Sequence, residues 1–192
     1  YYEAQGRTWE RAAFIKARPC AGAIDAGWDF LGRLRLFIWR RHLDFPAIQD
    51  AHDMRLRIRA HKGLTGPIRV LGHDLKLGQG GIREIEFFTQ TRQLITGGRD
   101  PDLRSRETLV ALAELARRGW VKDGVAANLT EAYVAHRTLE HRLQMLEDAQ
   151  THRMPTTEAG FARLVDFCGA DPASFADDLK ARLEVVHALT EP

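Results

Sequence analysis

The sequence predicts a mainly α-helical protein with a small β element. Apolar residues recur at spacings of three and four along much of the chain, most clearly over residues 129–146. Residues 63–81 are punctuated by glycines and cannot form a continuous helix. Residues 68–71 and 82–87 are the convincing strand candidates, the second running into a helix near Phe88. We therefore expect helices on both sides of a short glycine-rich β region.

The remaining elements are expected to be helices bounded by capping residues, glycines and prolines. They cover residues 3–18, 25–38, 44–62, 88–96, 104–118 and 128–146, and two more helices follow Pro155, the second starting at Asp171. Asn128, with Glu131 three residues later, resembles a capping box. His136 lies on the apolar face of that helix without a metal-type partner, so we expect a hydrogen-bonded packing histidine. Bulky aromatic residues are usually core residues, which we expect of Trp9, Trp28 and Trp39.

Composition is that of a soluble globular protein, with 44% hydrophobic and 28% charged residues. No apolar run approaches the roughly 20 residues needed to cross a bilayer. Cys20 and Cys168 lie far apart without metal-type spacing, which predicts a reduced, cytoplasmic protein. Residues 1–7 contain neither an initiator Met nor the apolar core of a signal peptide, so we expect a piece of a longer protein.

Charge is unevenly distributed along the chain. Residues 1–99 contain 17 Lys and Arg against 10 Asp and Glu, whereas residues 100–192 contain 11 against 16. A basic first half suits an anionic partner such as nucleotide phosphates, and an ordinary solvated surface explains it equally well. Arg55, Arg59 and Lys62 share a helix face without interleaved aromatic residues, so nucleic-acid binding is not expected.

Residues 74–87, DLKLGQGGIREIEF, are the segment with the clearest chemical potential. On a strand, Glu84 and Glu86 would point to the same side, because side chains alternate. Two carboxylates beside a glycine loop and Lys76 suit a site for Mg²⁺ and phosphate. The alternative is a tight turn before an edge strand, with both glutamates in solvent. The loop matches neither a Walker A motif nor a dinucleotide-binding fingerprint.

Residues 76–87 resemble the signature of the glutamine synthetase adenylyltransferase/adenylyl-removing family. Further segments that resemble this family occur in the same order along the chain, at residues 1–11, 15–18, 40–45, 97–99 and 150–155. The family has two related nucleotidyltransferase halves of the DNA polymerase β type, each followed by helices. The version of the signature found here resembles the N-terminal, AMP-removing half.

The resemblance implies that residues 1–99 are the later part of a polymerase β-like nucleotidyltransferase domain and that residues 100–192 are a helical bundle. Such transferases hold two Mg²⁺ ions with three carboxylates, two of them from a Gly-Ser and Asp-x-Asp motif. This chain lacks that motif, so the resemblance places it upstream of Tyr1 and implies that the fragment alone is inactive.

The resemblance also implies roles for individual residues. Glu84 would be a catalytic metal ligand as the third carboxylate, and Glu86 is the second candidate for this catalytic and metal-binding role. Contacts to nucleotide or phosphate would come from Lys76, Gly78, Gly80, Gly81, Arg83, Lys16 and Arg11. For Lys16 and Arg11 a solvated or intrahelical ion-pair role is the equal alternative. Inorganic phosphate would attack adenylyl-tyrosine on glutamine synthetase and release ADP, with ATP as the nucleotide of the opposite reaction. Glutamine synthetase and a PII-type signalling protein are the implied partners.

Two hypotheses remain. An enzyme fragment predicts Glu84 on a strand that faces an open groove, beside an unpaired strand edge. A non-catalytic helical regulatory module predicts a complete core without a truncated sheet, and glutamates that point to solvent.

Overall fold

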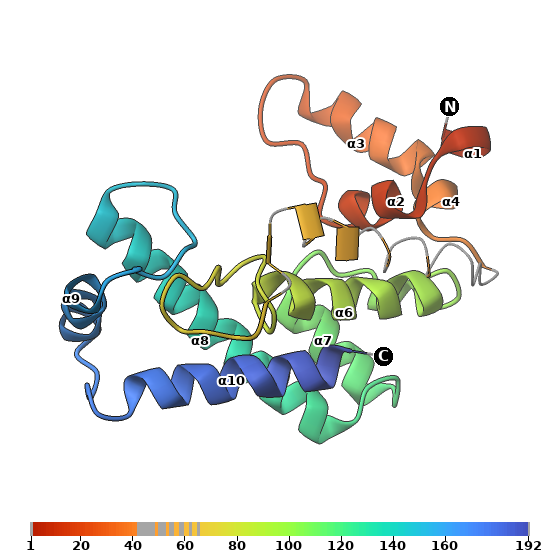
Figure 1. Ribbon diagram of the computed structural model, residues 1–192. Helices are drawn as coiled ribbons and strands as arrows, with labels where there is room; N and C mark the ends of the chain where they lie inside the picture. Colours follow the sequence, from red (N-terminus) through yellow and green to blue (C-terminus); the bar gives the residue numbers. More distant parts are fainter. Residues whose placement is uncertain are drawn as a thin grey trace. The chain divides into compact units, whose positions relative to one another are not determined.

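The structure is a computed structural model that describes residues 2–41 and 66–191, and residues 49, 53, 56, 57, 60, 61, 63 and 64 between them. It consists largely of helices (Figure 1). They are α1 (Tyr2–Gln5), α2 (Thr8–Ile15), α3 (Ile24–Arg33), α4 (Arg35–Ile38), α6 (Ile82–Thr96), the 3-10 helix η1 (Pro101–Leu103), α7 (Thr108–Arg117), α8 (Asp123–Glu147), α9 (Glu158–Cys168) and α10 (Phe175–Thr190). None of the helices in these ranges is both long and apolar enough to cross a membrane.

The predicted strands do not form. Residues 68–71 are irregular and residues 82–87 are the first turns of α6, so both strand predictions are wrong. Ile82, Ile85 and Phe88 are buried at intervals of three residues, which is helical spacing. Their burial overrides the β propensity of isoleucine. Among the described residues, β-type pairing is limited to one isolated antiparallel bridge, between Asp74 and Arg153.

The first compact unit comprises residues 1–57 and 88–123. Its core cluster consists of Ala12, Ile15, Leu34, Phe37, Ile38 and Leu94. The helix predicted over residues 3–18 is interrupted between α1 and α2, and the one predicted over 25–38 divides at Leu34. The core prediction is wrong for Trp9 and Trp28, whose side chains are 45% and 46% exposed. The reason for Trp28 is that α3 contributes no buried residue at all.

The second compact unit comprises residues 58–87 and 124–192. In it α8 and α10 cross at an angle in the view of Figure 1, and leucines of both helices belong to one core cluster. That cluster consists of Leu75, Leu139, Leu143, Met154, Leu164, Leu179 and Leu183. The predicted apolar face of α8 is therefore confirmed. The predicted capping box at Asn128 is wrong, because α8 begins at Asp123 and contains Asn128 in its interior.

Two predictions stay open. The helix expected over residues 44–62, with Arg55, Arg59 and Lys62, falls mostly outside the described residues. The predicted domain boundary after residue 99 also stays a prediction, because the compact units are spatial groups, each built from two separate segments of the chain.

Candidate functional site

The glycine-rich loop is fixed by hydrogen bonds to a distant segment. The backbone N–H of Leu75 donates to the carbonyl of His152 at 2.8 Å, and that of Met154 donates to the carbonyl of His73 at 2.8 Å. The Asp74 carboxylate accepts the N–H groups of the next residues, Lys76 and Leu77, at 2.9 and 2.8 Å. The structure thus joins residues 73–75, at the start of the glycine-rich segment, to residues 152–154 of the segment 150–155.

The N–H groups of Gly78, Gly80 and Gly81, which are predicted to bind phosphate, all donate to acceptors within residues 74–84. The N–H of Gly78 donates to the Asp74 carbonyl at 2.8 Å, and that of Gly81 donates to the Gly78 carbonyl at 3.1 Å. The N–H of Gly80 donates to Glu84 Oε2 at 2.9 Å. A phosphate would compete with these bonds, and phosphate binding by the loop stays a prediction.

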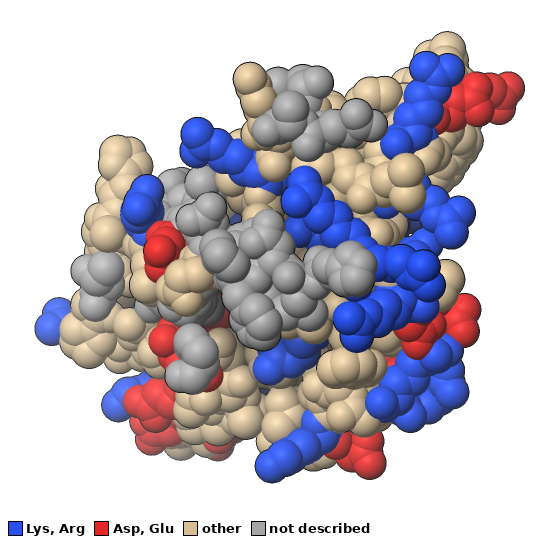
Figure 2. All heavy atoms as spheres, turned by 90° about the vertical axis from the view of Figure 1, so that its right-hand side faces the viewer, with Lys and Arg blue, Asp and Glu red and all other residues tan. Residues whose placement is uncertain are grey.

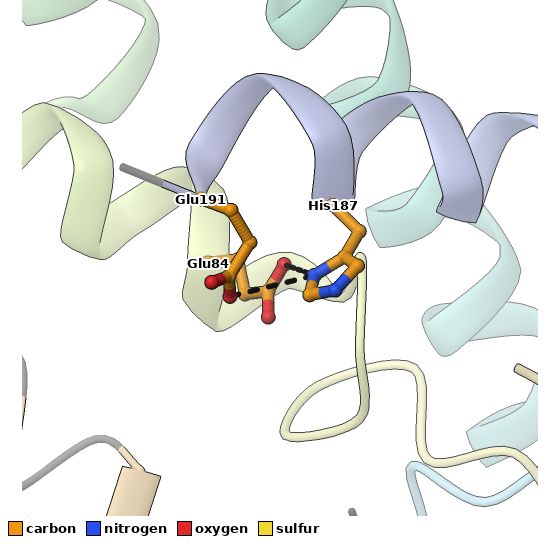
Figure 3. A group of neighbouring side chains, drawn as sticks. All are labelled: Glu84, His187 and Glu191. Atoms are coloured by element: carbon orange, nitrogen blue, oxygen red, sulfur yellow. Dashed lines mark hydrogen bonds and ion pairs between the residues drawn. The ribbon is translucent and has the colours of Figure 1, made fainter. Parts of the chain in front are cut away.

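Glu84 is a buried carboxylate at the start of α6, with a side chain only 2% exposed (Figure 3). Besides the Gly80 N–H, Oε2 accepts the Thr190 hydroxyl at 3.1 Å and lies 3.3 Å from His187 Nδ1. Burying a charged group is costly unless hydrogen bonds compensate for the lost water. Glu84 therefore holds the glycine loop and the last turn of α10 together.

His187 and Glu191 complete a group of possible metal ligands around Glu84 (Figure 3). One ligand atom from each side chain lies within 4.8 Å of the others, and His187 Nδ1 is 3.6 Å from Glu191 Oε1. An imidazole nitrogen with two carboxylate oxygens suits Zn²⁺ or Mn²⁺, whereas Mg²⁺ prefers oxygen ligands alone. This group could not be predicted from the sequence, because about a hundred residues separate Glu84 from His187.

Glu86 lies on a different side of α6 from Glu84. Because α6 is a helix, residues two apart point in nearly opposite directions, and the expectation that Glu84 and Glu86 share a side is wrong. Glu86 Oε2 accepts a bond from Arg83 Nη1 at 3.3 Å, and Oε1 accepts the Tyr133 hydroxyl at 3.3 Å. The assignment of the two glutamates as metal ligands stays a prediction.

Lys76 faces a buried carboxylate of α8. Its Nζ lies 3.8 Å from Oε1 of Glu140, whose side chain is 1% exposed. Arg137 Nη1 donates to the other oxygen of Glu140 at 2.5 Å. His152 Nδ1 lies 2.7 Å from Oε1 without the geometry of a hydrogen bond. Lys76, predicted as a phosphate contact, is thus one of three basic side chains around one buried carboxylate.

The two predicted phosphate contacts from the N-terminal helix lie in the first compact unit. Arg11 is buried, and its Nε and Nη2 donate to the Ile38 carbonyl at 3.2 and 3.1 Å, which ties α2 to the end of α4. Lys16 Nζ donates to Thr108 Oγ1 at 2.5 Å and lines a cavity. The structure does not bring either residue together with Glu84 in one described site.

His136 is fully buried in α8, which confirms the packing role. The expected hydrogen bond is missing, since neither ring nitrogen has a partner of normal geometry among the described residues. Burial lowers the pKa of His136 to about 4, the positive charges of Arg182 and His73 act in the same direction, and the Gly80 backbone opposes them.

We expect this histidine to make stability depend on pH. The folded pKa lies below the ordinary 6.5, so the unfolded chain binds more protons and the free energy of unfolding falls as pH drops from 6.5 to about 4. The loss attributable to His136 is roughly 3 kcal/mol. Urea unfolding at several pH values measures it, and His136→Leu should lose this dependence. The exposed His141 offers the control His141→Gln, and an unchanged profile in His136→Leu would contradict the assignment.

Most of the sequence matches a known family. The sequence model of the family described as GlnD PII-uridylyltransferase matches residues 52–192. This is more than half of the chain, and the chain belongs to this family.

Individual relatives are more similar still. Over 187 residues the chain is 54% identical to the bifunctional glutamine synthetase adenylyltransferase/adenylyl-removing enzyme of Rhodopseudomonas palustris strain TIE-1. The enzymes of the same description from Rhizobium meliloti strain 1021 and Brucella melitensis biotype 1 are 52% and 51% identical. Each comparison covers 97% of this chain and 19% of the relative, so the chain spans about a fifth of the length of these curated relatives. The resemblance stated from residues 76–87 is confirmed.

Proposed function

We propose that this chain is part of an enzyme that attaches AMP to glutamine synthetase and removes it, and that it comes from the half that removes AMP. The observation that carries the proposal is the identity of 51–54% over 97% of the chain. Inorganic phosphate would attack the phosphorus of adenylyl-tyrosine, the bond to the tyrosine oxygen would break, and that oxygen would take a proton as ADP leaves. A cytoplasmic location and a PII-type signalling partner belong to the same proposal.

The proposed reaction uses Mg²⁺, which would activate the attacking oxygen and stabilise the leaving one. Glu84 and Glu86 do not fit Mg²⁺ as a pair of ligands. Glu86 points away from Glu84, and one oxygen of Glu84 already accepts bonds from Gly80 and Thr190. We therefore assign no step to a metal on this pair, and propose that Glu84 positions the glycine loop for chemistry whose other carboxylates lie elsewhere in the enzyme.

The alternative is a non-catalytic helical module that binds glutamine synthetase or a signalling protein. The lack of strands among the described residues favours it over an enzyme fragment with a truncated sheet. The burial of Glu84 argues against it, because that hypothesis requires a glutamate in solvent.

The test is an assay of the complete enzyme that contains this chain. We expect it to release ADP from adenylylated glutamine synthetase and inorganic phosphate, and the 192-residue chain alone to release none. Glu84→Gln should lower the rate roughly tenfold or more, because an amide cannot accept all the bonds that Glu84 accepts. Glu131→Gln, at an exposed position on α8, is the matched control.

The possible outcomes test the proposed function and the role of Glu84 separately. Full activity of Glu84→Gln would show that Glu84 does not contribute to the reaction, and it would not contradict the proposed function. If the complete enzyme neither releases ADP nor transfers AMP, the proposed function is wrong and the regulatory alternative remains. If it transfers AMP from ATP without releasing ADP, the assignment to the AMP-removing half is wrong.

A further inference from the structure

Helix α3 borders an apolar groove in the first compact unit, which we call the α3 groove. Its volume is about 560 Å³. Trp28 and Leu31 of α3 line it, Ile15 and Ile38 contribute from the core of the unit, and Pro101 contributes from η1. Three arginines are the charged side chains of this lining, and the others are apolar. A groove of this size can take several large side chains of another molecule.

The apolar side chains of α3 are largely accessible to such a molecule. Trp28 and Phe30 are 46% and 48% exposed, and none of the residues of α3 is buried. Leu36, which follows α3 in the short helix α4, is 83% exposed. Trp28 and Leu31 lie three residues apart, so they share one side of the helix. Neighbouring exposed apolar side chains of this kind typically mark an interaction surface.

Arg35, Arg104 and Arg106 are the three arginines that line the α3 groove. The Arg106 guanidinium lies 5.2 Å from the centre of the Trp28 ring, and that of Arg104 lies 5.6 Å from the centre of the Trp39 ring. The faces of these rings attract the two guanidinium groups and help to hold them in place. The groove therefore combines an apolar surface with positioned positive charges.

The positive charge is not confined to these contacts. Burial lowers the pKa of Arg104, the nearby charge of Arg35 lowers it further, and Asp100 opposes both. A second basic cavity adjoins the groove, because Arg104 and Arg106 line both. Lysines and arginines are also abundant on the face of the protein shown in Figure 2. Carboxylates brought into these surroundings would be stabilised by the arginines.

We propose that the α3 groove is a docking site for an acidic amphipathic segment of a protein partner. Its aromatic or aliphatic side chains would pack against Trp28 and Leu31, and its aspartates or glutamates would pair with the three arginines of the groove. Charge complementarity favours this occupant, because a basic segment would be repelled and an uncharged one would gain nothing from the arginines. The inference goes beyond the proposed function and does not depend on it.

Selection from a random peptide library displayed on phage, with the 192-residue chain as the target, tests the docking site. We expect the enriched peptides to combine aromatic or aliphatic side chains with several acidic ones, and to bind saturably in fluorescence anisotropy. Trp28→Glu should weaken this binding roughly tenfold or more, because it replaces an apolar anchor with a repelling charge. Arg35→Glu should weaken it by a similar factor. Both side chains are exposed, so neither substitution should unfold the protein.

A charge exchange distinguishes ion pairing in the groove from nonspecific attraction. A peptide in which lysines replace the acidic residues should bind the variant with both Arg35→Glu and Arg106→Glu roughly fivefold or more tightly than it binds the unchanged chain. Trp120→Glu and Arg163→Glu are the matched controls, because both side chains are exposed and neither lines the groove. Each should change the affinity for the acidic peptide less than twofold.

Three results would overturn the proposal. The first is a selection that enriches no acidic amphipathic peptides. The second is an enriched peptide that binds Trp28→Glu or Arg35→Glu as tightly as the unchanged chain. The third is binding to vesicles that contain phosphatidylserine without binding to any peptide, since the α3 groove would then face a membrane surface. Because the readout is peptide binding, a failure here is distinct from a failure of the AMP-removal assay.

Discussion

Gly80→Ala is expected to lower the free energy of unfolding by roughly 3–5 kcal/mol. Gly80 has a φ of +69°, a conformation that costs any residue with a Cβ. A Cβ at this position would also lie against the Leu183 carbonyl oxygen and 2.6 Å from its carbon. These are backbone atoms of α10, so no side-chain rotation relieves the overlap. The loop would have to move and release the Gly80 N–H from Glu84.

The variant Gly72→Ala separates the cost of the positive φ from the cost of the overlap with α10. Gly72 has nearly the same φ, +72°, but a Cβ there would meet only a Thr156 methyl group at an ordinary 3.5 Å. We expect a loss of roughly 1 kcal/mol, the cost of the conformation alone. Urea unfolding of the unchanged protein and both variants gives the comparison. Equal losses in the two variants would mean that the glycine loop is not in close contact with α10.

Helices could be predicted where leucines recur at helical spacing and are buried in the structure, as in α7 and α8. The failures have physical causes. The apolar residues of Ile82–Phe87 break the strict alternation of a strand, and Ile82 and Ile85 are buried at a helical interval. At Gly6, between α1 and α2, a Cβ would collide with the Phe37 ring from another helix. Neither contact is local in the sequence.

The candidate site was predictable only in part. Residues 76–87 identified the segment, because glycines, a lysine and two glutamates at that spacing are informative without a structure. The partners of Glu84 were not predictable, since His187 and Thr190 are ordinary residues of an amphipathic helix. Arg104 and Arg106 were missed for a related reason. Only folding brings them to the lining of one cavity with Lys16 and Arg18.

Glu140→Ala is expected to lower the free energy of unfolding by roughly 3–5 kcal/mol, because it removes the one buried carboxylate that Lys76, Arg137 and His152 approach. The exposed Glu147 on the same helix offers the control Glu147→Ala, expected to change stability by less than roughly 0.5 kcal/mol. A loss below roughly 1 kcal/mol in Glu140→Ala would contradict a structural role for this group of charges.

A double-mutant cycle with Lys76→Met then decides what Lys76 does. If Lys76 serves mainly to compensate Glu140, the two substitutions should be non-additive by roughly 0.5 kcal/mol or more, since the residues are in contact. Additive losses would mean that the 3.8 Å ion pair contributes nothing to stability. Lys76 would then be available for the phosphate contact that its place before the glycines predicts. Glu140→Ala and Lys76→Met should also be measured in the AMP-removal assay. If Lys76 only supports Glu140, Lys76→Met should lower activity in proportion to the stability that it loses.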